Sequence, residues 1–166
     1  MNEYNIYPKQ YQHSNIPIEK NKCFVIMPFK LEFDYIYGEI KDGLDRAGFS
    51  CNRVDEITGS VPIIAKILNE ILSSRCIIAD LSGCNPNVFY ELGVSHSFKD
   101  ANNIIILKHK DSKVPFDIMH LTYIEYSEEN PKLLVSRILK NIEDVKFISE
   151  FQEIYVYTFL HYYYTP

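Results

Sequence analysis

Long hydrophobic runs are missing from the sequence, because the longest, such as Ile104 to Leu107, fall far short of the roughly 20 residues that a membrane-spanning helix needs. The polar start from Met1 to Asn5 has no signal-peptide apolar stretch. The 4 cysteines lack the close pairs of a zinc site and the density of a secreted disulfide scaffold. We therefore expect a cytoplasmic protein with no membrane partner, metal or resident cofactor, whose Cys23, Cys51 and Cys76 are reduced thiols within strands.

An excess of basic residues is missing as well. Lysine and arginine number 17 against 22 aspartates and glutamates, which gives a net charge of -5. This balance provides no general attraction to nucleic acid or to an anionic membrane, so any bound phosphate must be held by a local site. The 166 residues, 46% of them hydrophobic and without an internal repeat, suffice for one domain with its own core.

Short apolar runs alternate with segments of helical period from Lys22 onward, which is typical of β-α-β units and a parallel sheet. We expect helices over 33–47, 63–72, 88–98 and 131–142. The pattern predicts a single α/β domain with a five-stranded, mostly parallel sheet flanked by helices. The predicted strands are 23–27, 50–54, 76–80, 103–107 and 122–126.

Composition divides the chain into three parts. Residues 1–21 form an N-terminal arm without a sustained period, and residues 22–146 form the domain. Residues 147–166 hold 8 of the 23 aromatic side chains, so a helix there would be apolar around most of its circumference. We expect this C-terminal segment either to pack on its own domain or to form a homo-oligomer or partner interface.

Polar residues follow three of the predicted strands, at the edge where open α/β sheets bind ligands. An aromatic ring after the first strand can cover a base, and carboxylates and amides follow the other two strands. The candidate residues are Met27, Pro28 and Phe29 after the first strand, Asp55 and Glu56 after the second, and Asp80, Ser82, Asn85 and Asn87 after the third.

The run after the third strand predicts a turn and then a helix start. We expect Asn87 to be the N-cap of the helix over 88–98, whose first amides can take a phosphate. Glu91 then lies about one turn inside the helix, and if it faces the crevice its carboxylate joins Asp80. The alternative is structural, in which Glu91 favours the helix start and Asp80 caps a turn.

Clustered carboxylates without a nucleophile–histidine pair favour chemistry at an acetal-like carbon. Cleavage of an N-glycosidic bond passes through an oxocarbenium-like state that a carboxylate can stabilise or trap, while a second acid or an ordered water handles the leaving base. Glu91 and Asp80 are therefore the candidate catalytic residues, and a nucleoside or nucleotide is the candidate ligand.

Four segments resemble the nucleoside 2-deoxyribosyltransferase-like group, which is related in fold to TIR domains: Phe24–Phe29, Arg53–Ile57, Ile78–Gly83 and Asn85–His96. The resemblance implies a flavodoxin-like or TIR-like architecture. It places Glu91 on the family's catalytic glutamate, the nucleophile of the transferases and the key acid of NAD-cleaving TIR enzymes, and so adds NAD as a candidate substrate. Many bacterial relatives act in antiphage defence or nucleotide signalling.

The sequence departs from the transferases at one position. Six residues before the glutamate they carry an aspartate, and this chain has Asn85. An amide can hydrogen-bond a sugar or base but cannot act as an acid or base. Hydrolysis, or binding without turnover by a nucleotide sensor, therefore gains over base exchange, and Asp80 is the candidate for the missing carboxylate.

Overall fold

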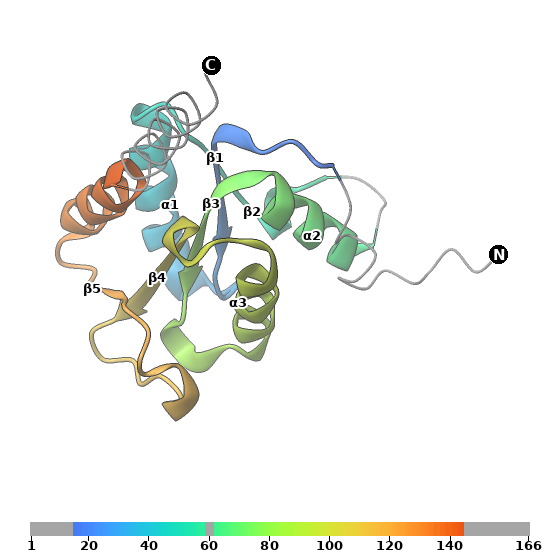
Figure 1. Cartoon of the computed structure of the whole chain (residues 1–166). Coiled ribbons are helices and arrows are strands. Elements are labelled where there is room, and N and C mark those ends of the chain that lie inside the picture. The colour runs from blue at the N-terminus through green and yellow to red at the C-terminus, as the bar shows by residue number, and fades with distance from the viewer. Residues whose placement is uncertain (1–14, 59–61, 145–166) are drawn as a thin grey trace, which may run out of the picture.

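The computed structural model of the chain describes residues 15–58 and 62–144. Five parallel strands form one sheet in the order β2-β1-β3-β4-β5, and helices cover both of its faces (Figure 1). The predicted α/β class is confirmed, and the observed strand order is that of flavodoxin-like folds. The strands are β1 (Glu19–Ile26), β2 (Ser50–Arg53), β3 (Ser74–Asp80), β4 (Ile104–His109) and β5 (Ile124–Tyr126).

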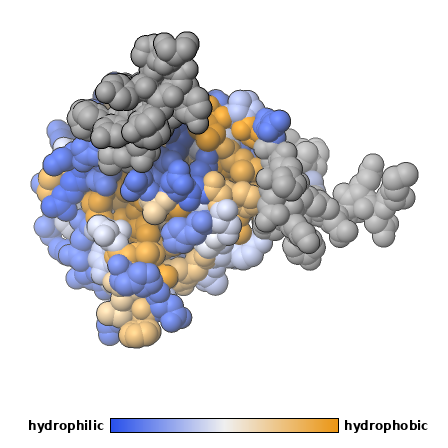
Figure 2. All heavy atoms as spheres, in the orientation of Figure 1, coloured by the Kyte–Doolittle hydropathy of each residue, from blue (hydrophilic) through white to orange (hydrophobic). Residues whose placement is uncertain are grey.

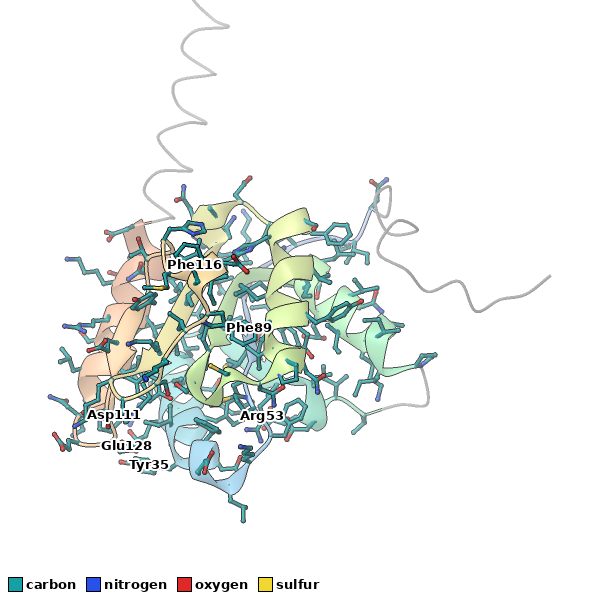
Figure 3. All side chains as sticks on the ribbon, turned by 90° about the horizontal axis from the view of Figure 1, so that it is seen from below. Tyr35, Arg53, Phe89, Asp111, Phe116 and Glu128 are labelled. Carbon is teal, nitrogen blue, oxygen red and sulfur yellow. The ribbon has the colours of Figure 1, made fainter. Side chains whose placement is uncertain are left out.

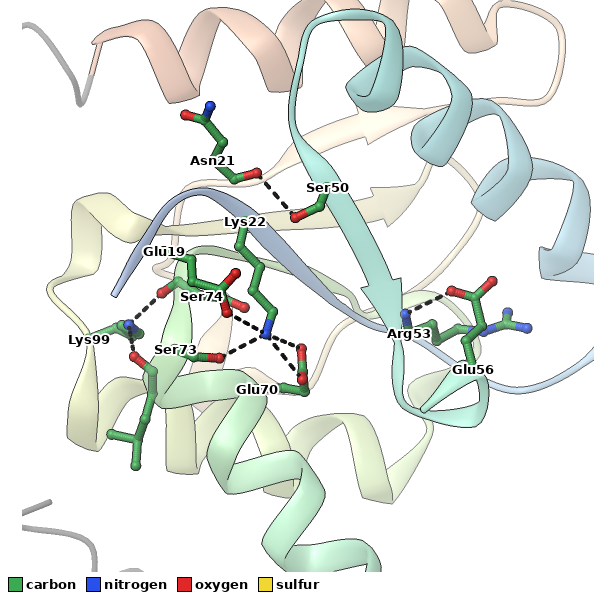
Figure 4. Close-up of polar contacts among 11 residues, drawn as sticks. Glu19, Asn21, Lys22, Ser50, Arg53, Glu56, Glu70, Ser73, Ser74 and Lys99 are labelled. Atoms are coloured by element: carbon green, nitrogen blue, oxygen red, sulfur yellow. Dashed lines mark hydrogen bonds and ion pairs between the residues drawn. The ribbon is translucent and has the colours of Figure 1, made fainter. Parts of the chain in front are cut away.

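Each predicted strand is present, with shifts at the ends. β5 begins at Ile124, two residues later than predicted, and β1 extends back to Glu19, so residues 19–21 of the predicted arm lie in the sheet. Polar contacts explain the extension, because Lys22 Nζ lies 3.2 Å from Glu70 Oε1 and donates to Ser73 Oγ at 2.9 Å (Figure 4). An apolar pattern cannot reveal a strand end that is held by such contacts.

The helices of the described residues divide between the two faces of the sheet (Figure 1). One face is covered by α1 (Leu31–Arg46) and by a helix over residues 131–144, and the other by α2 (Ile63–Ser73) and α3 (Pro86–Phe98). β3 carries buried side chains toward both helical layers, as expected for a central strand. The sheet is therefore sandwiched between two apolar cores.

Three cysteines lie side by side across the sheet. Cys23 of β1 is in register with Cys51 of β2 and with Cys76 of β3, and all three are buried free thiols. The prediction of reduced cysteines within strands is confirmed for these three. They pack as small apolar residues under α1.

Close packing between helices depends on one glycine. Gly43 of α1 is buried, and a Cβ atom built on it would collide with the Cγ1 atom of Val135 and lie 3.0 Å from its Cγ2 atom. Val135 belongs to the helix over residues 131–144, so the missing side chain lets this helix approach α1.

No helix of the described residues is long and apolar enough to cross a membrane. The aromatic C-terminal segment 147–166 and most of the N-terminal arm lie outside the described residues.

We expect Gly43→Ala to lower the free energy of unfolding by about 1–3 kcal/mol, because overpacking against Val135 outweighs the better helix propensity of alanine. Gly38→Ala in the same helix is the matched control, since a Cβ atom there meets nothing within 4 Å and should stabilise by up to about 1 kcal/mol. Urea unfolding measures both, and adding Val135→Ala should restore part of the loss. Equal stability of the two alanine variants would contradict the packing argument.

Candidate functional site

The end of β1 offers one aromatic surface to a ligand. Met27 is 2% exposed and Pro28 is buried, whereas Phe29 is 50% exposed. The Phe29 ring centroid lies 5.4 Å from the Arg53 guanidinium carbon, so a cation holds this ring. Of the three residues predicted here, only Phe29 therefore presents a side chain on which a base could stack.

The end of β2 is an ion-pair network centred on Arg53. Its guanidinium donates to both carboxylate oxygens of Asp55, at 2.7 and 2.8 Å, and to Asp34 of α1 at 3.0 Å. Figure 3 labels Arg53 close to the ribbon of α1. These bonds from Arg53 hold the pKa of Asp55 below its usual value although partial burial opposes them. Asp55 is therefore an ionised partner of Arg53 rather than an acid.

Glu56 has its own protein partners. Tyr37 donates to one carboxylate oxygen at 2.5 Å, and Lys41 donates to the other at 2.7 Å. The Arg53 backbone amide adds a bond at 3.4 Å, which Figure 4 shows. Burial raises the pKa of Glu56, but the bonds from Lys41 and Tyr37 outweigh it and leave the pKa lowered. A ligand hydroxyl must compete with these groups for Glu56.

Asp80 ends the central strand as a fully buried carboxyl. It is 0% exposed, and its oxygens accept from the Ser82 amide at 2.9 Å and the Tyr126 hydroxyl at 2.6 Å. Burial raises the pKa of Asp80, and the bonds from Ser82 and Tyr126 counter only part of that rise. Both oxygens are therefore bound by the protein, as in the turn-capping alternative.

Ser82 links the ends of three strands. Its hydroxyl oxygen lies 3.2 Å from the Tyr126 hydroxyl and accepts from the His109 amide at 2.7 Å. Sequence reasoning placed Tyr126 in a strand without giving it a role. Tyr126 reaches Asp80 because β3, β4 and β5 are neighbours in the sheet. The hydropathy pattern does not give this strand order, so the sequence could not assign Tyr126 to the site.

The turn before α3 differs from the prediction in its cap. Asn85, not Asn87, is the N-cap, because its side-chain oxygen accepts from the Asn87 amide at 2.9 Å while Pro86 occupies the first helical position. The prediction that Asn87 caps the helix is wrong by two residues, since proline is favoured just inside a helix start. Gly83 and Cys84 take positive φ angles of 71° and 51° in the turn.

Glu91 lies on the sheet-facing side of α3. Val88, Leu92 and Ser95 share that side and are buried, and Glu91 itself is 7% exposed. Among the described residues, no hydrogen bond or ion pair reaches the Glu91 carboxyl. Burial therefore raises the pKa of Glu91 to about 7, with no partner to oppose it.

The predicted site residues thus separate into two groups. Hydrogen bonds within the protein engage Asp55, Glu56, Asp80, Ser82 and Asn85, whereas none reaches the Glu91 carboxyl within the described residues. Phe29 packs against Arg53 but keeps an exposed ring. Across residues 15–58 and 62–144, no three histidine, cysteine, aspartate or glutamate side chains are grouped as metal ligands would be. A carboxyl with a strongly perturbed pKa beside the carboxyl edge of a parallel sheet is a functional-site candidate.

Comparisons with known proteins support the fold. No family model matches the sequence, and no curated protein matches it closely enough to count as a relative. The TIR domain of a Toll-related receptor from Hydra magnipapillata is similar in structure, with a TM-score of 0.59 and 18% identity over 73% of this chain and 97% of that one. A flavoprotein from Thermotoga maritima has a TM-score of 0.54 and 16% identity over 76% of this chain and 37% of that one. These likenesses show a TIR-like α/β fold.

We expect Tyr126→Phe to lower the free energy of unfolding by about 1–3 kcal/mol, because Asp80 stays buried with one hydrogen-bond donor removed. Tyr123→Phe is the control, since no hydrogen bond of the Tyr123 hydroxyl is found within the described residues and its change should stay within about 0.5 kcal/mol. Chemical denaturation compares them. Indistinguishable losses would show that the Asp80 contact adds nothing.

We expect Glu91→Gln to stabilise the protein at alkaline pH. The folded pKa of about 7 lies above the ordinary 4.5, so the wild type loses stability as pH rises from about 4.5 to about 7. Glutamine has no charge to bury, so its gain approaches about 3 kcal/mol at pH 8 and vanishes near pH 4. Denaturation across pH tests this against Glu32→Gln, whose side chain is 63% exposed. A gain that does not change with pH would contradict a buried, titrating Glu91.

Proposed function

We propose that the chain binds a nucleoside, nucleotide or NAD-type dinucleotide at the carboxyl edge of the sheet and cleaves its N-glycosidic bond with Glu91. The observation that carries the proposal is the desolvated carboxyl of Glu91, 7% exposed and with its pKa raised to about 7. Asp80 of this edge has two donors, whereas Glu91 has none within the described residues, so nothing there offsets the cost of its burial. Such a cost is typical of sites where the group acts on a ligand.

The ionised Glu91 carboxylate would act at the anomeric carbon. As the bond from C1′ to the base nitrogen breaks, its electron pair leaves with the base and positive charge develops on C1′ and the ring oxygen. A carboxylate in a low-dielectric setting stabilises that charge or bonds to C1′. Water then adds to C1′, displacing the carboxylate where it has bonded there, and loses a proton to the solvent, which completes hydrolysis.

The other carboxyls bear on which base can leave. Asp80 has both oxygens bound to Ser82 and Tyr126, and Asn85 cannot donate a catalytic proton, so an acid for the leaving base is lacking among these residues. A nicotinamide that leaves from its pyridinium form departs neutral and needs no proton. We therefore favour an NAD-type substrate over an ordinary nucleoside, an activity in keeping with antiphage defence.

The remaining candidates receive binding roles. The exposed ring of Phe29 would stack on a base. The start of α3 offers a phosphate fewer donors than predicted, because Pro86 has no amide and the Asn87 amide is bonded to the Asn85 side chain. Asp55 and Glu56 would accept from ligand hydroxyls, and Asn85 would orient the ribose. Asp80 is a positioning residue, because it acts through the ends of β3 and β5 that Ser82 and Tyr126 connect.

A second candidate function is a nucleotide sensor that binds in the same place without turnover. The observation that favours it is that the Asn85 side chain caps α3 and the Asp80 side chain accepts from the Ser82 amide in the turn. Neither side chain is then free to act as an acid. The sensor needs no acid, and a ligand would raise the free energy of unfolding by about 2.7 kcal/mol at a hundredfold excess over its dissociation constant.

The test is chromatography of the purified chain incubated with NAD and with a panel of nucleosides and nucleotides. Base release should fall at least about a hundredfold in Glu91→Gln and stay unchanged in Glu32→Gln. In the wild type, kcat/KM should rise with pH through about 7, because the ionised carboxylate is required. Release that persists in Glu91→Gln would exclude Glu91, and a thermal shift without any release would establish the sensor.

A further inference from the structure

Half of β4 has no strand on its outer side. β5 pairs with β4 only at Leu107, Lys108 and His109, whereas β3 pairs with β4 from Ile104 onward. The described residues therefore leave Ile104–Ile106 bonded to a strand on one side only. An open edge of this kind exposes backbone groups that a further strand can bind.

The direction of the backbone groups follows from the ladder. In a parallel strand, alternate residues direct both their N–H and C=O groups to the same neighbour. The Leu107 carbonyl accepts from Leu81 beyond β3 at 3.0 Å, so Leu107 and Ile105 face β3, and Ile104 and Ile106 face outward. The Ile104 amide is bonded to the Ala101 carbonyl, which leaves the Ile104 C=O and the Ile106 N–H at the edge.

A groove of about 470 Å³ lies along these groups. Ile104–Ile106 form its floor and residues 120–124 form one wall. Asn141 and Asp144, of the helix over residues 131–144, line its end. Figure 2, in the orientation of Figure 1, shows hydrophobic residues framed by hydrophilic ones over the region of β4. The groove combines an apolar floor with unpaired backbone groups, which suits an extended peptide.

The chain itself carries a segment of matching chemistry. Asp144 is the last described residue, and 166 − 144 = 22 residues follow it. Within them, residues 154–160 read Ile-Tyr-Val-Tyr-Thr-Phe-Leu, all of them β-branched, aromatic or leucine. Alternation at period 2 would place Ile, Val, Thr and Leu on one face and the three aromatic rings on the other.

We propose that residues 154–160 of the same chain add as a strand to the open half of β4. Their backbone would bond the Ile104 C=O and the Ile106 N–H, and one face of side chains would fill the groove. The connection 145–153 spans up to roughly 30 Å when extended, which is ample for a segment that starts at the wall of the groove. This strand covers the apolar floor and closes an edge that would otherwise pair with other chains.

The tail of the same chain is favoured over that of a second copy by its attachment. A short covalent connection gives an effective concentration in the millimolar range, far above micromolar protein. The intramolecular strand therefore forms first at ordinary concentrations.

The test is amide hydrogen exchange of the full chain by NMR. Proline is disfavoured inside a strand, so Val156→Pro and Tyr157→Pro, in the middle of the run, should weaken the added strand and speed exchange of the Ile106 amide at least about tenfold. Thr165→Pro lies beyond the run and should leave it unchanged. The Ile78 amide of β3 should stay protected in every variant, which shows that the domain remains folded.

Two results would overturn the proposal. One is an Ile106 amide that exchanges equally fast in the wild type and in both proline variants, since nothing then depends on the strand. The other is protection of Ile106 that disappears on dilution together with a dimer mass in sedimentation, because the occupant is then the tail of a second copy.

Discussion

A buried carboxyl at the end of the central strand must be hydrogen-bonded, and the carboxyl edge of the sheet is organised around that requirement. Asp80 is 0% exposed, and leaving such a group without donors costs several kcal/mol. Ser82 and Tyr126 supply the donors, and the Ser82 hydroxyl in turn accepts from His109. The ends of β3, β4 and β5 are held together by a single set of polar contacts.

A second buried carboxyl, that of Glu91, differs from Asp80 in having no hydrogen-bond donor within the described residues. Glu91 shares the apolar side of α3 with Val88 and Leu92, and burial alone sets its pKa. Asp80 shows that this sequence can supply donors to a buried acid where the fold requires them. This difference between the two acids is the reason why we propose a structural role for Asp80 and a chemical role for Glu91.

Hydropathy was enough to predict the elements, but not the contacts between their ends. The apolar runs of β3 and β4 and the stripes of α2 and of the helix over 131–144 placed each element within a few residues. The site depended on facts that no local pattern holds. Asp80 meets Tyr126 only because of the strand order, and Arg53 meets Asp34 only because α1 packs beside β2. Glu91 was singled out by its motif, while its burial emerged from the way α3 lies on the sheet.

The register of β5 follows from the same constraint that orders the edge. Tyr126 brings its hydroxyl to Asp80, which fixes the end of β5 beside His109 at the carboxyl end of β4. The preceding residues, 120–123, line the groove instead of pairing with Ile104–Ile106. The sheet is thus closed at the candidate site and open at the other end of β4, where an added strand would complete the ladder without disturbing Asp80. A chain that carries a β-prone run soon after Asp144 in its sequence has the means to close this edge.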